Sequence, residues 1–217
     1  MSRVIILGGH GKVALLAEPL LAANGHEVTA VIRKPEQSDE IEAAGATPVV
    51  ADIEHASTDE LADVLRGNDV VVWSAGAGGG SAERTLAVDR DAAIRAMEAT
   101  KAAGVERFVM VSYFGAGPDH GVPEDSDFYT YAKAKTEADE HLQATDLDWT
   151  ILRPSGLTLD AATGHIETGE HVEPAQASRD NVAHVISAVV DDAAGASRRI
   201  IEFNDGHQLI AEVISSS

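Results

Sequence analysis

The chain has 217 residues, of which 44% are hydrophobic, so it is long enough to bury a sizeable core, and we expect one domain over residues 1–217. It carries 36 acidic against 16 basic residues, a formal net charge of -20, which disfavours nucleic acids and anionic membrane surfaces as partners. It has no cysteine, which excludes disulfides, thiolate metal sites and a cysteine nucleophile.

Apolar runs rich in Val and Ile alternate with helical patterns along the chain. The runs predict strands at 3–7, 27–32, 47–51, 69–75, 107–113, 148–154 and 198–203. The intervening patterns predict helices at 12–24, 58–66, 82–103, 127–145 and 180–191, the last capped by Asp180. This alternation predicts an α/β fold, a doubly wound parallel sheet (Rossmann-like) of about seven strands with helices on both faces.

A glycine-rich turn follows the first predicted strand. It comprises Gly8, Gly9, His10, Gly11, Lys12 and Val13, and Ala14 follows it. Gly8 and Gly11 allow a tight turn that approaches a pyrophosphate closely, and the next helix directs its positive end at the negative charge. The turn therefore predicts dinucleotide binding, with His10 as an exposed loop residue.

The end of the second strand indicates which dinucleotide is bound. Arg33 and Lys34 stand where enzymes that use NAD commonly place an acidic residue for the ribose 2′-hydroxyl. Arg33 suits bidentate contact with a 2′-phosphate, and Lys34 adds a point charge. We therefore expect NADP(H) to be preferred, with NAD(H) possible. The alternative is two solvated loop cations.

Between about residues 156 and 179 the alternation breaks into a polar stretch with room for a short hairpin or a loop pair. Because ligands of open α/β sheets bind at the carboxyl ends of the strands, this stretch is either a lid over the substrate or a surface excursion. It contains His165 and His171 with three acidic residues, Glu167, Glu170 and Glu173. A predicted loop is a poor frame for metal ligands, so no metal site is expected.

Seven motifs, one after another along the chain, indicate a family. They are GGHGKVA, VIRKPEQ, VVADI, WSAGAGGG, VERFVMVSYFGA, YAKAKTEADEHLQATDLDWTILRP and SRDNVAHVI. With them the chain resembles the atypical short-chain dehydrogenase/reductase superfamily, specifically its small NAD(P)-binding members related to the NmrA-like proteins and the flavin or biliverdin reductases.

The resemblance implies an NADP(H)-binding oxidoreductase that transfers a hydride to or from a small carbonyl, quinone or flavin-like substrate. Two alternatives remain: a non-catalytic NADP(H)-binding redox sensor, and a sugar epimerase/dehydratase-like enzyme, although 217 residues leave little room for a substrate domain that holds a nucleotide sugar. The chain starts in a strand pattern with no signal segment, and no apolar run is long enough to span a bilayer. We therefore expect a cytoplasmic monomer or homodimer.

The resemblance also implies cofactor contacts at later strand ends. Asp52 and Ile53 would flank the adenine, and Asp52 has the alternative role of a loop-ordering or helix-capping carboxylate. Three residues, Ala75, Gly76 and Ala77, would lie along the middle ribose and the nicotinamide. Arg153, at the end of the sixth strand, would lie beside the nicotinamide or the substrate.

Catalysis in the superfamily uses a Tyr and a Lys four residues later on one helix face. The tyrosine gives or takes the proton at the reacting carbonyl, and the lysine stabilises the phenolate and holds the nicotinamide ribose. The pair Tyr131 and Lys135 matches the family pattern better than Tyr129 and Lys133, which stay as the alternative. Ser112 resembles the serine that hydrogen-bonds the substrate carbonyl.

Overall fold

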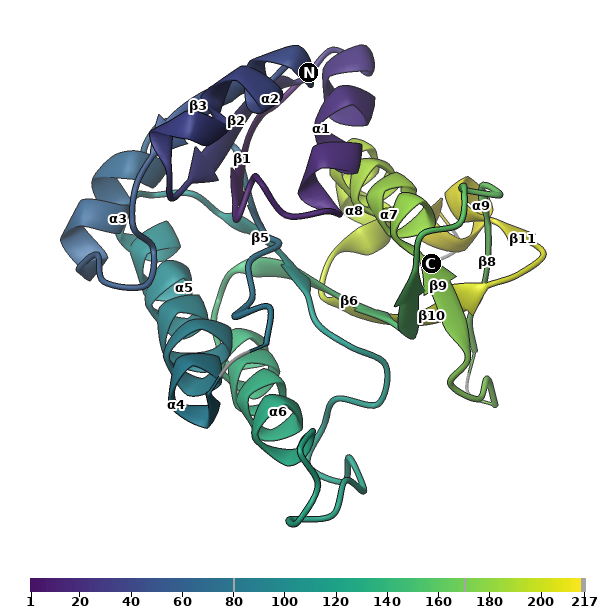
Figure 1. Cartoon of the computed structure of the whole chain (residues 1–217). Helices are drawn as coiled ribbons and strands as arrows, with labels where there is room; N and C mark the ends of the chain where they lie inside the picture. The colour runs from purple at the N-terminus through teal and green to yellow at the C-terminus, as the bar shows by residue number, and fades with distance from the viewer. Residues whose placement is uncertain (80, 170, 216–217) are drawn as a thin grey trace.

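A twisted β-sheet runs through the middle of the protein (Figure 1). A computed structural model describes residues 1–79, 81–169 and 171–215 of the chain. Its strands are β1 (Arg3–Leu7), β2 (Glu27–Ile32), β3 (Thr47–Val50), β4 (Val70–Trp73), β5 (Arg107–Val111), β6 (Asp148–Pro154), β8 (His165–Glu167), β10 (Arg199–Asp205) and β11 (Gln208–Leu209). Over these residues the strand order is β11-β8-β10-β6-β5-β4-β1-β2-β3. The strands from β3 to β10 are parallel, and β8 pairs antiparallel with both β10 and β11.

The seven predicted strands form the parallel part of the sheet, so the predicted α/β class is confirmed. The additional strands β8 and β11 at one edge, and the separate parallel pair β7 (Gly156–Thr158) and β9 (Gln176–Ser178), were not predicted. Each has only two or three residues, in or beside polar sequence, so no apolar run marks them.

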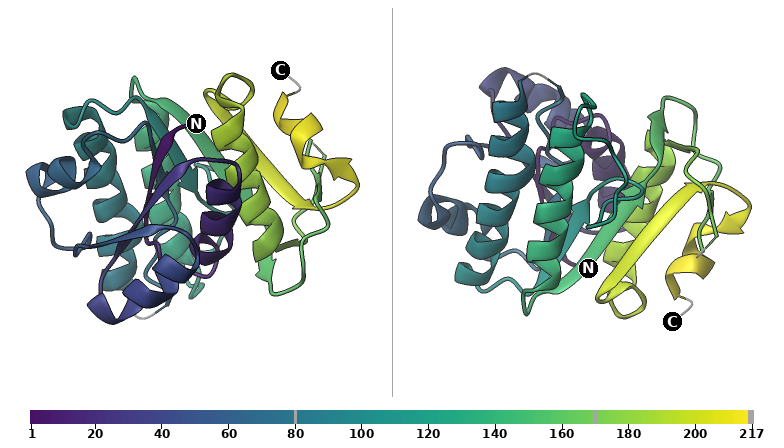
Figure 2. Two further views of the ribbon diagram at one scale, coloured as in Figure 1. Left: turned by 90° about the horizontal axis from the view of Figure 1, so that it is seen from above. Right: turned by 90° about the horizontal axis from the view of Figure 1, so that it is seen from below.

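Helices cover both faces of the sheet, as the two views in Figure 2 show. The helical segments are α1 (Ala14–Ala23), η1 (Pro35–Gln37), α2 (Ser38–Ala43), α3 (Thr58–Leu65), α4 (Ala82–Thr85), η2 (Leu86–Ala92), α5 (Ala93–Ala102), α6 (Tyr129–Gln143), α7 (Arg179–Asp191), α8 (Ala193–Ala196) and α9 (Ile210–Ser215). Helices α1 and α7 pack together on one face, and α3, α5 and α6 pack on the other. Within the described residues, no helix is long and apolar enough to cross a membrane.

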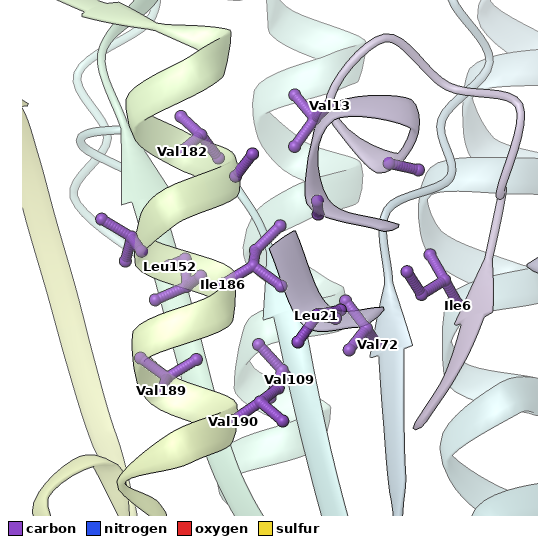
Figure 3. Close-up of a cluster of buried hydrophobic side chains, with 14 of the residues drawn as sticks. Ile6, Val13, Leu21, Val72, Val109, Leu152, Val182, Ile186, Val189 and Val190 are labelled. Carbon is purple, nitrogen blue, oxygen red and sulfur yellow. The ribbon is translucent and has the colours of Figure 1, made fainter. Parts of the chain in front are cut away.

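The hydrophobic core is divided by the sheet into two clusters. Figure 3 shows the cluster under α1 and α7, where Leu21 and Ile186 of the helices meet Val72 and Val109 of the sheet. Each such aliphatic side chain stabilises the fold by about 1.5–3 kcal/mol when it leaves water. The two covered faces explain why the parallel strands are apolar at consecutive positions.

Two of the predicted helices differ from the prediction in a way that bears on the site. The helix predicted over 82–103 contains a π-helical segment, η2, in which Asp89 is buried. The helix predicted from Asp180 begins at Arg179, and its cap is Ser178, whose Oγ accepts a hydrogen bond from the Asn181 backbone N–H at 2.9 Å. The expectation that Asp180 caps this helix was wrong, because its carboxylate accepts from the Ala162 N–H at 2.9 Å instead.

The polar stretch 156–179 is tied to the body of the protein by the buried Asn181. Its Oδ1 accepts from the backbone N–H groups of Thr163 and Gly164, and its Nδ2 donates to the His165 carbonyl at 3.1 Å and to Asp205 Oδ1 at 2.7 Å. These bonds hold residues 163–165 against the start of α7.

Candidate functional site

A cleft of about 700 Å³ lies at the carboxyl ends of β1, β2, β4 and β5. A volume of this size suits a small molecule or a cofactor. The cleft spans the place where β1 lies between β2 and β4, which is the point where the strand order reverses. In doubly wound sheets, ligands bind at this switch point.

The glycine turn forms one wall of the cleft. Gly8 has a φ of +86°, and a Cβ there would lie 2.7 Å from Ala75 Cα. A Cβ on Gly9 would lie 2.6 Å from Ala30 Cβ, and one on Gly11 would lie 3.0 Å from the Gly8 carbonyl oxygen, which accepts a hydrogen bond from the Gly11 N–H at 2.9 Å. The turn is therefore pressed against β2 and the loop after β4: a Cβ at Gly8 or Gly9 would clash, and one at Gly11 would make a tight contact.

Most of the predicted cofactor residues line this one cleft. They are Gly8, His10, Gly11, Lys12, Val13, Arg33, Asp52, Ile53, Ala75, Gly76, Ala77 and Lys135. The cleft does not include Gly9, which packs on β2, or the exposed Lys34. Arg33 lines the cleft and Lys34 does not, because successive side chains of an extended chain point to opposite sides.

His10 is held by its neighbours and is not the exposed loop residue that was predicted. Its ring bonds Gln37 Nε2 at 2.8 Å and Glu40 Oε2 at 2.7 Å, and its side chain is about one-third exposed. Gln37 and Arg33 line the cleft beside it. This group forms the end of the cleft that follows β2.

Asp52 orders the loop after β3. Its Oδ1 accepts from the Glu54 N–H at 3.1 Å, and its Oδ2 lies 3.0 Å from His55 Nδ1. The hydrogen bond with His55, followed by that with Glu54, lowers the pKa of Asp52, although burial opposes the shift. Asp52 therefore combines its place in the cleft with the loop-ordering role that was its alternative.

Tyr131 and Lys135 line the opposite end of the cleft, one turn apart on α6. Lys135 is only 1% exposed, and its Nζ donates to the Val111 carbonyl at 2.8 Å. Burial lowers the pKa of Lys135, while the negative charges of Asp89 and Asp139 act to raise it. This end of the cleft thus holds a buried lysine amine beside a tyrosine.

The alternative pair lies outside the cleft. The ring centroid of Tyr129 is 5.7 Å from that of His120, and the exposed Lys133 lies 3.9 Å from Glu137. In the described part of the chain, Tyr131 and Lys135 are the pair with this spacing that lines the same cleft as the glycine turn.

Tyr131 packs in an aromatic cluster with Tyr113 and Phe128, at centroid distances of 5.6 and 5.1 Å. Burial raises the pKa of Tyr131, and the negative charge of Asp89 adds to this effect. The phenol therefore stays protonated at neutral pH, and it can act as a proton donor.

Behind this end of the cleft lies a buried polar network centred on Asp139. Its Oδ2 accepts from Ser112 Oγ at 2.9 Å and from Arg153 Nε at 3.0 Å, and Arg153 Nη1 also donates to Glu202 at 3.2 Å. Arg153 does not line the cleft, so its predicted contact with cofactor or substrate stays a prediction. Ser112 does line it, but because its proton is directed to Asp139, the oxygen presents acceptor lone pairs to the cleft.

Two further side chains in the cleft were not predicted. Asp89 is 2% exposed, and its Oδ2 accepts from the Ala77 N–H at 3.0 Å. Arg84 donates to the Ala77 carbonyl, and its Nε lies 3.7 Å from Glu54. They hold the loop after β4 in place. Helical periodicity does not reveal Asp89, because the π-helical segment η2 departs from a 3.6-residue repeat.

The histidines of the polar stretch are not gathered into a site. In the described residues, no group of three His, Asp or Glu side chains could hold a metal ion. His165 Nδ1 instead lies 2.7 Å from the Thr163 carbonyl oxygen. Glu170, which the sequence placed near this group, lies outside the described residues.

Comparison with known proteins gives matches over nearly the whole chain. Residues 8–193 match a family model described as NAD(P)H-binding. A Bacillus subtilis protein named "Uncharacterized sugar epimerase YhfK" is 35% identical, covering 98% of each chain. The structure of a putative NAD-dependent epimerase/dehydratase from Bacillus halodurans is 31% identical, with a TM-score of 0.92 and 100% of each chain covered. The oxidoreductase YlbE from Lactococcus lactis is 28% identical, with a TM-score of 0.86, covering 99% of this chain and 95% of that one.

Proposed function

The chain belongs to the NAD(P)H-binding family that its sequence matches, and from this premise we propose that it is an NADP(H)-dependent oxidoreductase that reduces a small carbonyl, quinone or flavin-like acceptor. The resemblance to NAD(P)-binding short-chain dehydrogenase/reductase proteins is confirmed by this membership. The observation that carries the proposal is that Tyr131 and Lys135 line the same cleft as the glycine turn.

The residues of the cleft fit a dinucleotide. The close packing of Gly8 and Gly9 fixes the turn that leads into α1, where backbone N–H groups would approach a pyrophosphate. Arg33 and Lys12 line the cleft, and neither has a carboxylate within 4 Å among the described residues. Their positive charges are therefore available, Arg33 for a 2′-phosphate and Lys12 for the pyrophosphate. This free charge supports a preference for NADP(H) over NAD(H).

In the proposed reaction the bound nicotinamide supplies the hydride. Tyr131 would donate its proton to the oxygen of the acceptor, since the raised pKa keeps the phenol protonated at neutral pH. Lys135 would hold the nicotinamide ribose, and the negative charges of Asp89 and Asp139 favour its charged form. Asp89 also keeps Ala77 in place, so the loop along the nicotinamide is fixed before the cofactor binds.

The names of the relatives favour an epimerase as the second candidate. An epimerase of this type must first remove a proton from a substrate hydroxyl, so its tyrosine must act as a phenolate base. The raised pKa of Tyr131 opposes the formation of this phenolate. We therefore favour reduction over epimerisation. We also propose that the protein acts in the cytoplasm as a monomer or homodimer.

The direct test is NADPH oxidation, followed by absorbance, with a panel of quinones, flavins and aldehydes. We expect turnover with at least one acceptor, and we expect Tyr131→Phe to lower kcat about 100-fold while the Kd for NADPH stays the same. Tyr129→Phe is the matched control and should leave kcat unchanged. If NADPH binds but no acceptor is reduced, the protein is a sensor or an epimerase instead.

A further inference from the structure

Arg179 is a cleft residue that the proposed function leaves unused. It is the first residue of α7, and its side chain is partly buried. Its Nη1 donates to the carbonyl oxygens of Leu157 and Thr158, at 3.0 and 2.8 Å. These bonds anchor the guanidinium to β7, beside the cleft that Arg179 lines.

Arg179 differs from the other basic residues of the cleft because neither a carboxylate nor the proposed cofactor uses its charge. The basic residues that line it, among the described residues, are Lys12, Arg33, Arg84, Lys135 and Arg179. In that set only Arg84 lies within 4 Å of a carboxylate, that of Glu54. The proposed cofactor contacts use Lys12, Arg33 and Lys135. Arg179 therefore remains as a positive charge without a carboxylate partner, in a chain of net charge -20.

The nearby carboxylates do not neutralise Arg179. Asp127 lines the same cleft, and Asp180 follows Arg179 in α7. Neither lies within 4 Å of the guanidinium, and Asp180 is engaged with the Ala162 N–H and lies 3.9 Å from His184. The Nε and Nη2 atoms of Arg179 make no hydrogen bond within the described residues, which leaves one planar edge of the guanidinium for a ligand.

Apolar side chains line the same cleft as Arg179. Phe128 and Leu157 both line the cleft although they are 44% and 39% exposed. Phe128 belongs to the aromatic cluster with Tyr113 and Tyr131, where its ring meets that of Tyr113 edge-on at 5.3 Å. Exposed apolar side chains at a cleft mouth indicate a ligand with an apolar body.

We propose that Arg179 selects the substrate by binding a carboxylate, so that the acceptor is a planar, largely apolar carbonyl compound that carries one carboxylate group. The inference rests on the proposed function. A single guanidinium edge matches the two oxygens of a carboxylate in bidentate geometry. The other Lys and Arg side chains that line the cleft without a carboxylate within 4 Å, Lys12, Arg33 and Lys135, are those assigned to the cofactor, which favours a singly charged group over a phosphate.

The test compares benzoate with benzamide, which have nearly the same shape and differ in charge. Calorimetry measures the Kd of each probe for the protein saturated with NADP⁺. We expect benzoate to bind at least about tenfold more tightly than benzamide, because hydrogen bonds to charged groups are the stronger ones. Arg179→Gln should abolish this ratio and Arg179→Lys should keep part of it, while Arg66→Gln, an exposed arginine outside the cleft, should leave it unchanged.

Because Arg179 also anchors β7, the ratio of the two Kd values is the decisive quantity: a loosened β7 weakens both probes alike. The proposal is overturned if benzoate has no advantage, if neither probe binds, or if Arg179→Gln leaves the ratio intact. It is also overturned if Arg179→Gln weakens NADPH as much as benzoate, since Arg179 is then a cofactor residue. Failure of the wild type to bind NADP(H) at all refutes the proposed function, and the probes are then compared on the protein alone.

Discussion

Glu18 gives a prediction about stability that follows directly from its place in α1. Its side chain is fully buried, and neither carboxylate oxygen has a hydrogen-bond partner in the described structure. Burial raises the pKa of Glu18 to about 8 from an ordinary value of 4.5, and the negative charge of Glu40 contributes. We predict that Glu18→Gln, which removes the charge and keeps the shape, stabilises the protein at alkaline pH.

The size of the effect follows from the pKa shift. The interval from 4.5 to about 8 covers about 3.5 pH units, and each unit corresponds to about 1.4 kcal/mol, so the charged form of Glu18 costs on the order of 5 kcal/mol. The folded state binds the proton more tightly than the unfolded state. The wild type therefore loses stability as pH rises from about 4.5 to about 8, and the loss is complete above about 8.

Urea unfolding of the wild type and Glu18→Gln at pH values from 5 to 9 measures this difference. The free energy of unfolding of the variant, relative to the wild type, should rise with pH and level off above about 8. Glu42→Gln, which changes an exposed carboxylate on α2, is the control and should show no such rise. A difference between Glu18→Gln and wild type that is the same at every pH refutes the reasoning.

Two further substitutions test the frame of the site. Gly9→Ala places a Cβ 2.6 Å from Ala30 Cβ, so it should destabilise the protein by about 1–3 kcal/mol and weaken NADPH and NADH to a similar degree; an unchanged Tm contradicts the close packing. Asn181→Ala removes the hydrogen bonds that hold residues 163–165. It should cost about 2–4 kcal/mol and speed limited proteolysis near these residues, and cleavage at the wild-type rate would show that they are held by other contacts.

The parallel sheet could be predicted from the sequence because its strands are covered on both faces, and consecutive apolar residues such as Val70–Trp73 mark them clearly. The strands β8 and β11 could not be predicted, since two or three residues in polar sequence carry no periodic signal. The cap of α7 was predicted at Asp180 and lies at Ser178, because either residue type caps helices and only the tertiary contact of Asp180 with Ala162 separates them.

In the candidate site too, features set by local spacing could be predicted, and contacts between residues far apart in the sequence could not. The turn after β1 and the pair Tyr131 and Lys135 could be predicted, since each depends on a local spacing along the chain. The bond from Ser112 to Asp139 and the engagement of Asp89 by Ala77 connect residues 27 and 12 positions apart. No local pattern encodes such pairs, so they emerge only when the helices pack on the sheet.

The central claim, that this cleft binds NADP(H) through its 2′-phosphate, is tested most directly by the equilibrium Kd values of NADPH and NADH. The account predicts that the wild type binds NADPH at least about tenfold more tightly, the effect of roughly one charge-assisted contact. It also predicts that Arg33→Gln removes most of this ratio and leaves the Kd of NADH nearly unchanged. Equal affinities of the wild type for the two cofactors, or a ratio that survives Arg33→Gln, would contradict it.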